Sequence, residues 1–175
     1  GNGHINDTYL AVYDVDGKTV RYILQCMNKS IFTKPVELME NVVAVTSYLR
    51  KIIIENGGDP ERETLNVILA ADGKPYFIDA QGEYWRAYTF VEDATCYDKV
   101  ETPQDFYESA VSFGNFQRLL ADYPAETLHE TIVGFHDTKA RFEVFKKAVA
   151  DDVCGRAASV QDEINFVLAH EDVAN

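Results

Sequence analysis

The chain begins Gly1-Asn2-Gly3-His4-Ile5-Asn6-Asp7-Thr8, a glycine-bearing loop that leads into Tyr9-Leu10-Ala11-Val12-Tyr13-Asp14-Val15 and an Asp16-Gly17 turn. Glycine lets a backbone approach a bulky anion, and consecutive N–H groups in such a loop can hold phosphate oxygens. The same residues are also compatible with an ordinary turn. The Asp-Gly pair between β-branched and aromatic segments predicts a hairpin, with strands at 8–15 and 19–25.

One helix and a three-stranded meander are predicted after the hairpin. The helix is expected over residues 35–55, because apolar side chains recur there at alternating intervals of four and three: Leu38, Val42, Val45, Leu49 and Ile52. Strands are expected at 65–70, 76–79 and 84–91, separated by turns at Asp72-Gly73 and Gln81-Gly82. The first 91 residues therefore predict an α+β unit, a five-stranded antiparallel sheet with one helix.

The pattern becomes helical in the second half of the chain. Thr102 stands three residues before Asp105, which is typical of a capping box, and an apolar stripe follows as far as Leu120. Further helices are expected at 139–149 and 159–170. These signals predict a small lobe at 1–91, a connector at 92–102 and the beginning of a helical lobe at 103–175.

Charge and cysteine content restrict the kinds of partner and compartment. The chain has 29 acidic and 16 basic residues, a net charge of −13, and its Lys and Arg residues do not cluster, so nucleic-acid binding is not supported. Cys26, Cys96 and Cys154 are odd in number and lack CxxC spacing, which argues against a disulfide framework or a zinc site. No apolar run reaches the roughly 18 residues of a membrane span. We therefore expect a cytoplasmic protein that binds neither nucleic acid nor membrane.

Six segments, in order and at plausible spacing, resemble the N-acetylhexosamine 1-kinases. They are Gly1–Tyr9 (GNGHINDTY), Tyr22–Gln25 (YILQ), Leu38–Val42 (LMENV), Trp85–Tyr88 (WRAY), Phe113–Phe116 (FGNF) and Glu130–Thr138 (ETIVGFHDT). The resemblance covers nearly the whole chain. Those enzymes are similar in fold to aminoglycoside phosphotransferases, choline kinases and protein kinases. The resemblance implies a protein kinase-like fold and an enzyme that transfers phosphate from ATP, with Mg²⁺, to the anomeric hydroxyl of a small sugar.

The resemblance also implies site residues. The ATP-binding set would be Gly1, Gly3, His4, Asn6 and Thr8 of the loop, Gln25 of the third kinase strand, Glu40 of the helix, and a hinge of Val91, Glu92 and Asp93. Glu40 would stand where kinases carry the glutamate that pairs with a cation of the third strand, and backbone N–H and C=O groups of the hinge would bind adenine. The substrate-binding set would be His136, Asp137 and Thr138. Simpler roles compete with these: His4 and Asn6 could hydrogen-bond the loop to itself, Glu40 could be a solvated acid, and Asp137 or Thr138 could cap a helix.

Two departures from the kinase pattern predict that the chain is catalytically incomplete. Gln25 stands where a kinase carries Lys or Arg to hold phosphates. The catalytic loop, with a base Asp, an Asn five residues later and a further metal-binding Asp, is not found. Asp172, in His170-Glu171-Asp172, is the nearest candidate for a catalytic residue, but we interpret it as part of a helix end. We expect the catalytic and metal-binding residues beyond this chain, and a first strand before Gly1.

Two other functions remain open at this point. One is a non-catalytic binding or interaction domain on a kinase-like scaffold, with which Gln25 and the missing loop agree. The other is a kinase for an amino alcohol or an aminoglycoside, with which the acidic balance is compatible. The aromatic residues of the strand at 84–91 favour packing in the sheet over carbohydrate stacking.

Overall fold

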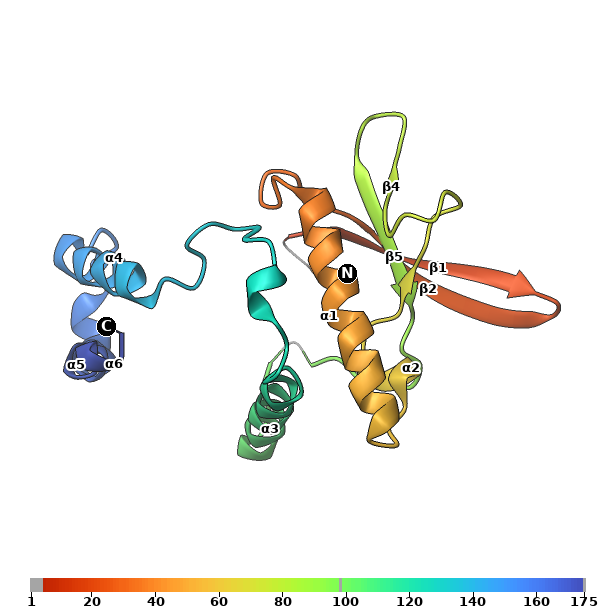
Figure 1. Cartoon of the computed structure of the whole chain (residues 1–175). Helices are drawn as coiled ribbons and strands as arrows, with labels where there is room; N and C mark the ends of the chain where they lie inside the picture. The colour runs from red at the N-terminus through yellow and green to blue at the C-terminus, as the bar shows by residue number, and fades with distance from the viewer. Residues whose placement is uncertain (1–4, 98, 175) are drawn as a thin grey trace. The chain divides into compact units, whose positions relative to one another are not determined.

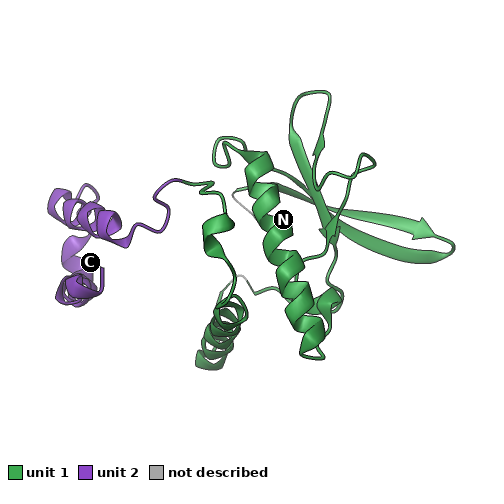
Figure 2. Cartoon of the chain, viewed as in Figure 1, with its two compact units in different colours: residues 1–132 green, residues 133–175 purple. Residues whose placement is uncertain are grey.

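The computed structural model describes residues 5–97 and 99–174. The chain divides into two compact units, Gly1–Ile132 and Val133–Asn175 (Figure 2). Gly1, Gly3 and His4, three of the predicted loop residues, lie outside the described part. The predicted lobe boundary at 92–102 does not coincide with this division and stays a prediction.

The first unit is built on a five-stranded antiparallel sheet (Figure 1). Its strands are β1 (Asp7–Val15), β2 (Lys18–Cys26), β3 (Val67–Ile68), β4 (Phe77–Ile78) and β5 (Tyr84–Thr89). The order is β1-β2-β5-β3, and β4 also pairs with β5. The predicted α+β class with a five-stranded antiparallel sheet is thus confirmed, and β5 is central because three other strands pair with it.

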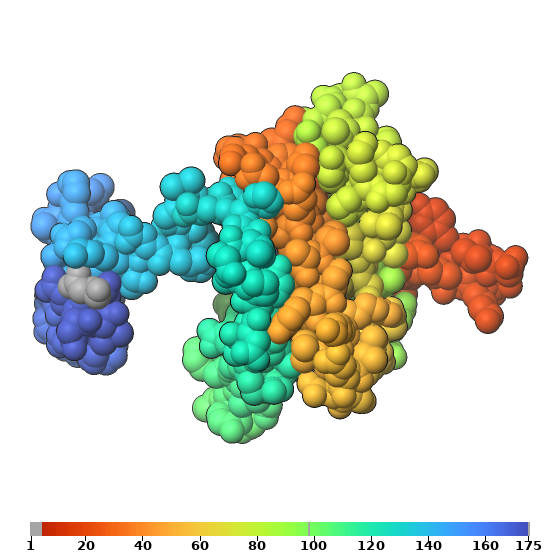
Figure 3. All heavy atoms as spheres, viewed as in Figure 1, coloured from red at the N-terminus to blue at the C-terminus, as the bar shows by residue number. Residues whose placement is uncertain are grey.

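The β1–β2 hairpin forms as its turn chemistry predicts. Asp16 and Gly17 both adopt positive φ, 54° and 77°, which matches the twist of a two-residue hairpin turn. The register pairs Thr8 with Gln25 and Tyr13 with Val20. Because β5 pairs only with residues 22–26 of β2, the outer half of the hairpin projects from the rest of the unit (Figure 3).

Helix α1 (Pro35–Glu55) lies across one face of the sheet (Figure 1). Its length agrees with the prediction, but its buried face does not. The buried residues are Pro35, Met39, Leu49 and Ile53, whereas only Leu49 of the predicted stripe is buried. The other four members are half-buried: Leu38, Val42, Val45 and Ile52. The face of α1 that is buried is therefore rotated around the helix axis relative to the predicted stripe. Consecutive residues of a helix point about 100° apart, so a shift of one residue changes the face.

The remaining elements of the first unit are short apart from one helix. Helix α2 (Pro60–Glu63), which the sequence did not predict, is capped by the Asp59 side chain. Strands β3 and β4 are two residues each, shorter than predicted. Helix α3 (Pro103–Leu119) carries the expected capping box between Thr102 and Asp105, and a 3₁₀ turn, η1 (Ala125–Thr127), follows it.

The second unit contains only helices among its described residues. They are α4 (Thr138–Asp151), η2 (Ala157–Val160), α5 (Gln161–Ala169) and α6 (Glu171–Ala174). Phe142 of α4 and Ile164 of α5 are buried. Both predicted helices are present, although the second begins as the 3₁₀ turn η2. In the described part of the chain, every helix is too short or too polar to cross a membrane.

Candidate functional site

A polar cluster lies on the sheet face that α1 covers. It consists of Thr8 on β1, Gln25 on β2, and Arg86 and Tyr88 on β5. The strand register places Thr8 opposite Gln25 and Gln25 opposite Arg86, so these side chains emerge from one face in neighbouring rows. Tyr88 is two residues along β5 and shares that face. Thr8 is the last residue of the predicted phosphate loop, so the cluster begins where that loop ends.

Gln25 is the centre of this cluster. Its carboxamide oxygen accepts hydrogen bonds from Arg86 Nε at 3.1 Å and Nη2 at 3.0 Å, and from the Tyr88 hydroxyl. Its Nε2 donates to Thr8 Oγ1 at 2.9 Å. A guanidinium has only donors, so the carboxamide oxygen must face Arg86 and the amide nitrogen must face Thr8. The orientation of Gln25 therefore follows from its partners.

Arg86 is surrounded by groups that do not neutralise its charge. Its Nη1 lies 4.0 Å from the sulfur of Met39, a fully buried residue of α1, and its guanidinium lies 5.5 Å from the centre of the Tyr88 ring. In the described part of the chain, no carboxylate lies within ion-pair distance of Arg86. A positive charge thus remains available on this face.

The chain's other half-buried cations are neutralised. Arg50 and Lys146 are the only other half-buried members of the sixteen Lys and Arg residues, all of which the structure describes. Arg50 lies 2.6 Å from a Glu61 oxygen, and Lys146 lies 2.7 Å from a Glu143 oxygen. Arg86 therefore differs from both in lacking a carboxylate partner.

Tyr88 keeps its proton in this setting. Burial raises the pKa of its phenol above the ordinary value, and the neighbouring Arg86 charge offsets part of that rise. The hydroxyl is therefore a neutral donor to Gln25 over the physiological pH range. It holds the carboxamide without adding a negative charge that would compete with an anionic ligand.

Asn6 supports the chain where it enters β1. Its Oδ1 accepts from the Asn28 N–H at 3.1 Å, which joins the start of β1 to the end of β2. Next to it is a cavity of about 440 Å³ with polar residues in its lining, among them Lys29 and Glu83, which form an ion pair at 2.8 Å. The Asn6 side chain thus joins the predicted loop to the segment after β2 and not to the loop itself, and its predicted role at phosphate stays a prediction.

Glu40 lies away from Gln25 and Arg86. Its Oε2 is 2.7 Å from His129 Nε2, and its side chain is 57% exposed. The next residue, Asn41, donates to the His129 carbonyl at 2.8 Å and accepts from the His129 N–H at 2.9 Å. The glutamate expected to pair with a strand cation therefore fastens the segment around residue 129 to α1. Met39, one residue earlier, lies beside Arg86 instead.

The predicted hinge has side-chain and backbone partners of its own. The Glu92 carboxylate pairs with Arg21 of β2, and the Glu92 carbonyl accepts from Arg62 at 2.9 Å. Asp93 adopts a positive φ of 55°. This carbonyl, one of the groups predicted to read adenine, is thus already hydrogen-bonded, while the roles of Val91 and Asp93 remain predictions.

The predicted sugar-binding residues belong to the second unit. Asp137 caps α4 by accepting from the Ala140 N–H at 2.8 Å, as the alternative interpretation expected. His136 packs against the Phe135 ring with centroids 4.8 Å apart, and Thr138 begins α4. Asp172 is an exposed residue in the first turn of α6. A substrate role for His136, Asp137 and Thr138 stays a prediction.

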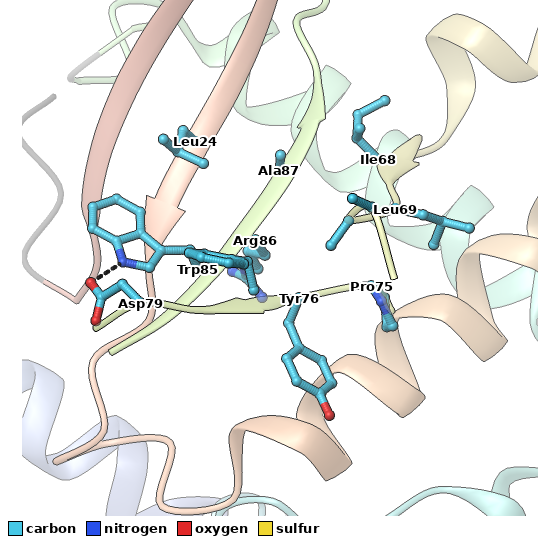
Figure 4. Close-up of a pocket in the computed structure, with 12 residues that line it drawn as sticks. Leu24, Ile68, Leu69, Pro75, Tyr76, Asp79, Trp85, Arg86 and Ala87 are labelled. Carbon is cyan, nitrogen blue, oxygen red and sulfur yellow. Dashed lines mark hydrogen bonds between the residues drawn. The ribbon is translucent and has the colours of Figure 1, made fainter. Parts of the chain in front are cut away.

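The opposite face of the sheet carries an apolar cavity of about 540 Å³ (Figure 4). Side chains alternate along β5, so Trp85 and Ala87 lie on the other face from the Arg86 side chain, although Arg86 is also one of the residues that line the cavity (Figure 4). Leu24, Ile68, Leu69 and Tyr76 also line the cavity. Its carboxylate, Asp79, accepts from the Trp85 indole N–H at 2.8 Å. The cavity therefore offers apolar surface, and its acid is engaged in fixing Trp85.

Asp79→Asn is expected to destabilise the fold at neutral pH and to lose this effect in acid. The Trp85 indole, followed by the Glu83 N–H, holds the pKa of Asp79 below its ordinary value. A lowered folded-state pKa gives stability that is present above the unfolded pKa of about 3.9 and is lost as pH falls through the folded pKa. Urea unfolding followed by Trp85 fluorescence at several pH values measures this. A difference from the parent protein that stays constant down to about pH 2 would contradict it.

The sequence interpretation missed Arg86 and Tyr88 as site residues. The signal was the WRAY segment itself, in which the alternation of a strand places Arg86 and Tyr88 on one face. In the described part of the chain, no three His, Cys, Asp or Glu side chains form a group that could hold a metal ion. No protein-family model matches this chain, so the site described here rests on the chain's own residues.

Proposed function

We propose that this chain is the nucleotide-binding part of an ATP-dependent phosphotransferase whose acceptor is the anomeric hydroxyl of an N-acetylhexosamine. The proposal begins from the six segments that resemble the N-acetylhexosamine 1-kinases. It is supported by an antiparallel sheet with one long helix across it, followed by helices in the second half of the chain. The order of these elements is the one that the resemblance implies.

The polar cluster beneath α1 is the observation that carries the proposal. A helix on a sheet normally buries apolar side chains, and burying polar groups costs free energy unless they are hydrogen-bonded. Here Thr8, Gln25, Arg86 and Tyr88 are hydrogen-bonded to one another. The one charged member has no carboxylate partner among the described residues. This combination suits an anionic ligand at the end of a glycine-bearing loop.

The residues present fit the phosphates of a nucleotide better than they fit a metal. Backbone N–H groups of the loop and the Arg86 guanidinium would bind phosphate oxygens. Magnesium, when bound, would neutralise part of the phosphate charge. Because the described residues form no metal-binding group, we assign no step of the reaction to a metal held by this chain. The sugar would lie against His136, Asp137 and Thr138.

Nucleotide binding by this chain tests the proposal. We expect Mg-ATP to bind saturably but more weakly than micromolar, because the metal-binding aspartate of the kinase pattern is not found in the sequence. A nitrogen-15 NMR titration would locate the bound nucleotide from shifted amide signals of β1, β2 and β5. If ATP at tens of millimolar leaves these signals in place, the chain is not a nucleotide-binding domain. Micromolar affinity would show that metal or charge is supplied by residues that we have not identified.

A further inference from the structure

We propose that Arg86 supplies from β5 the positive charge that the β2 position of Gln25 lacks, and that Gln25 is its positioning residue. The anion that Arg86 binds is a phosphate group of the nucleotide. The inference rests on the proposed function and adds a specific residue to it. Arg86 would then determine how strongly the chain prefers a nucleoside triphosphate to the bare nucleoside.

The strand register lets Arg86 take over the function of a cation at position 25. Residues directly opposite in an antiparallel pair have Cβ atoms about 5 Å apart. Gln25 and Arg86 are such a pair, and the longer Arg86 side chain reaches back to the end of Gln25. The guanidinium is therefore held at the tip of the side chain where the kinase pattern expects a positive charge.

The hydrogen bonds leave one edge of the guanidinium available. A guanidinium has five N–H groups in a rigid plane. The edge formed by Nε and Nη2 faces the Gln25 oxygen at 3.1 and 3.0 Å, and Nη1 has only the Met39 sulfur at 4.0 Å. The edge between Nη1 and Nη2 thus retains one N–H on each nitrogen. Two parallel N–H groups are the geometry with which arginine binds phosphate.

The lack of a carboxylate is the second argument. A charge removed from water is costly unless an opposite charge accompanies it, and the half-buried Arg50 and Lys146 both have such a partner. A glutamate at position 25 would have the same side-chain length as Gln25, but its carboxylate would neutralise Arg86. The neutral carboxamide orients the guanidinium and leaves its charge for a ligand.

The test compares ATP with adenosine on variants of this chain in the NMR titration. Arg86→Gln should weaken ATP binding about tenfold or more, the size expected for losing a charge-assisted bidentate contact, and change adenosine binding by less than about twofold. Gln25→Glu should also weaken ATP, because its carboxylate would neutralise Arg86 without removing it. Arg118→Gln removes the same unit of charge from an exposed site on α3 and should leave both affinities unchanged.

A double variant that moves the positive charge from position 86 to position 25 distinguishes a role of Arg86 in binding from a role in folding. The double variant Gln25→Lys with Arg86→Gln should recover ATP binding over Arg86→Gln alone, because the charge returns to the same face from β2. If Arg86→Gln does not fold, the ATP affinity of Gln25→Glu still tests the inference, because this variant keeps the length of every side chain. If the parent chain binds ATP but Gln25→Glu and Arg86→Gln bind it equally well, this inference is wrong and the proposed function stands. If the parent chain binds no nucleotide, the proposed function itself fails.

Discussion

Met39→Ala is expected to lower the free energy of unfolding of the first unit by about 2–5 kcal/mol. Met39 is fully buried on the face of α1 that meets the sheet, and its sulfur contacts Arg86. Truncation to alanine removes apolar contacts and leaves a cavity that the surrounding strands can fill only in part. Urea unfolding followed by circular dichroism measures the change, with Trp85 fluorescence as a second probe.

Met39→Leu is the matched control for this prediction. A swap that nearly conserves volume usually costs less than about 1.5 kcal/mol, so the leucine variant should unfold close to the parent. If alanine and leucine at position 39 were equally well tolerated, Met39 would not be packed between α1 and the sheet. The placement of Arg86 against α1 would then be wrong as well.

Leu49→Ala is expected to cost a similar amount, about 2–5 kcal/mol, at the other end of the buried face of α1. Leu49 is 5% exposed, and the neighbouring buried residue is Ile53. Ile54→Ala provides the comparison on the same helix, because Ile54 is 56% exposed and a surface substitution usually changes stability by less than about 0.5 kcal/mol. Equal destabilisation by the two variants would contradict the orientation of α1.

The features predicted correctly from the sequence depend on residues close together in the chain. The Asp16-Gly17 turn needs two residues at positive φ, and it forms as expected. The capping box needs only a hydroxyl and an acid three residues apart, and Thr102 and Asp105 provide it. The length of α1 was predictable because Pro35 fixes its start and Gly57 adopts a positive φ just after its end. Local chemistry of this kind does not depend on the rest of the fold.

The face of α1 that packs on the sheet and the lengths of the short strands could not be predicted in the same way. Apolar residues occupy more than one side of α1, so the sequence alone did not decide between Leu38 and Met39 as the residue nearest the sheet. Strands β3 and β4 end after two residues because their pairing depends on where β5 lies. These outcomes are set by tertiary packing, which overrides local preference.

The candidate site was predictable only in part for the same reason. Gln25 and Thr8 stand out within their own segments, and both belong to the polar cluster. Arg86 joins them through a strand pairing across 61 residues of sequence. Glu40 was expected to meet a strand cation, but the rotation of about 100° between consecutive helical residues brings Met39 there instead. Position 25 itself carries no charge, as the sequence shows, but the neighbouring strand β5 places a cation beside it, which the sequence did not predict.

The most direct test of the proposed function is a product assay on two proteins, this chain and the protein encoded by its full reading frame. Each is incubated with Mg-ATP and N-acetylglucosamine or N-acetylgalactosamine, ADP release is measured, and phosphorus NMR identifies the product. We expect no turnover by this chain and a sugar 1-phosphate from the protein that the full reading frame encodes. Turnover by this chain that Asp172→Asn abolishes would contradict our placement of the active site. Phosphorylation of an amino alcohol or aminoglycoside alone would contradict the substrate, and no transfer to any acceptor would contradict the enzyme itself.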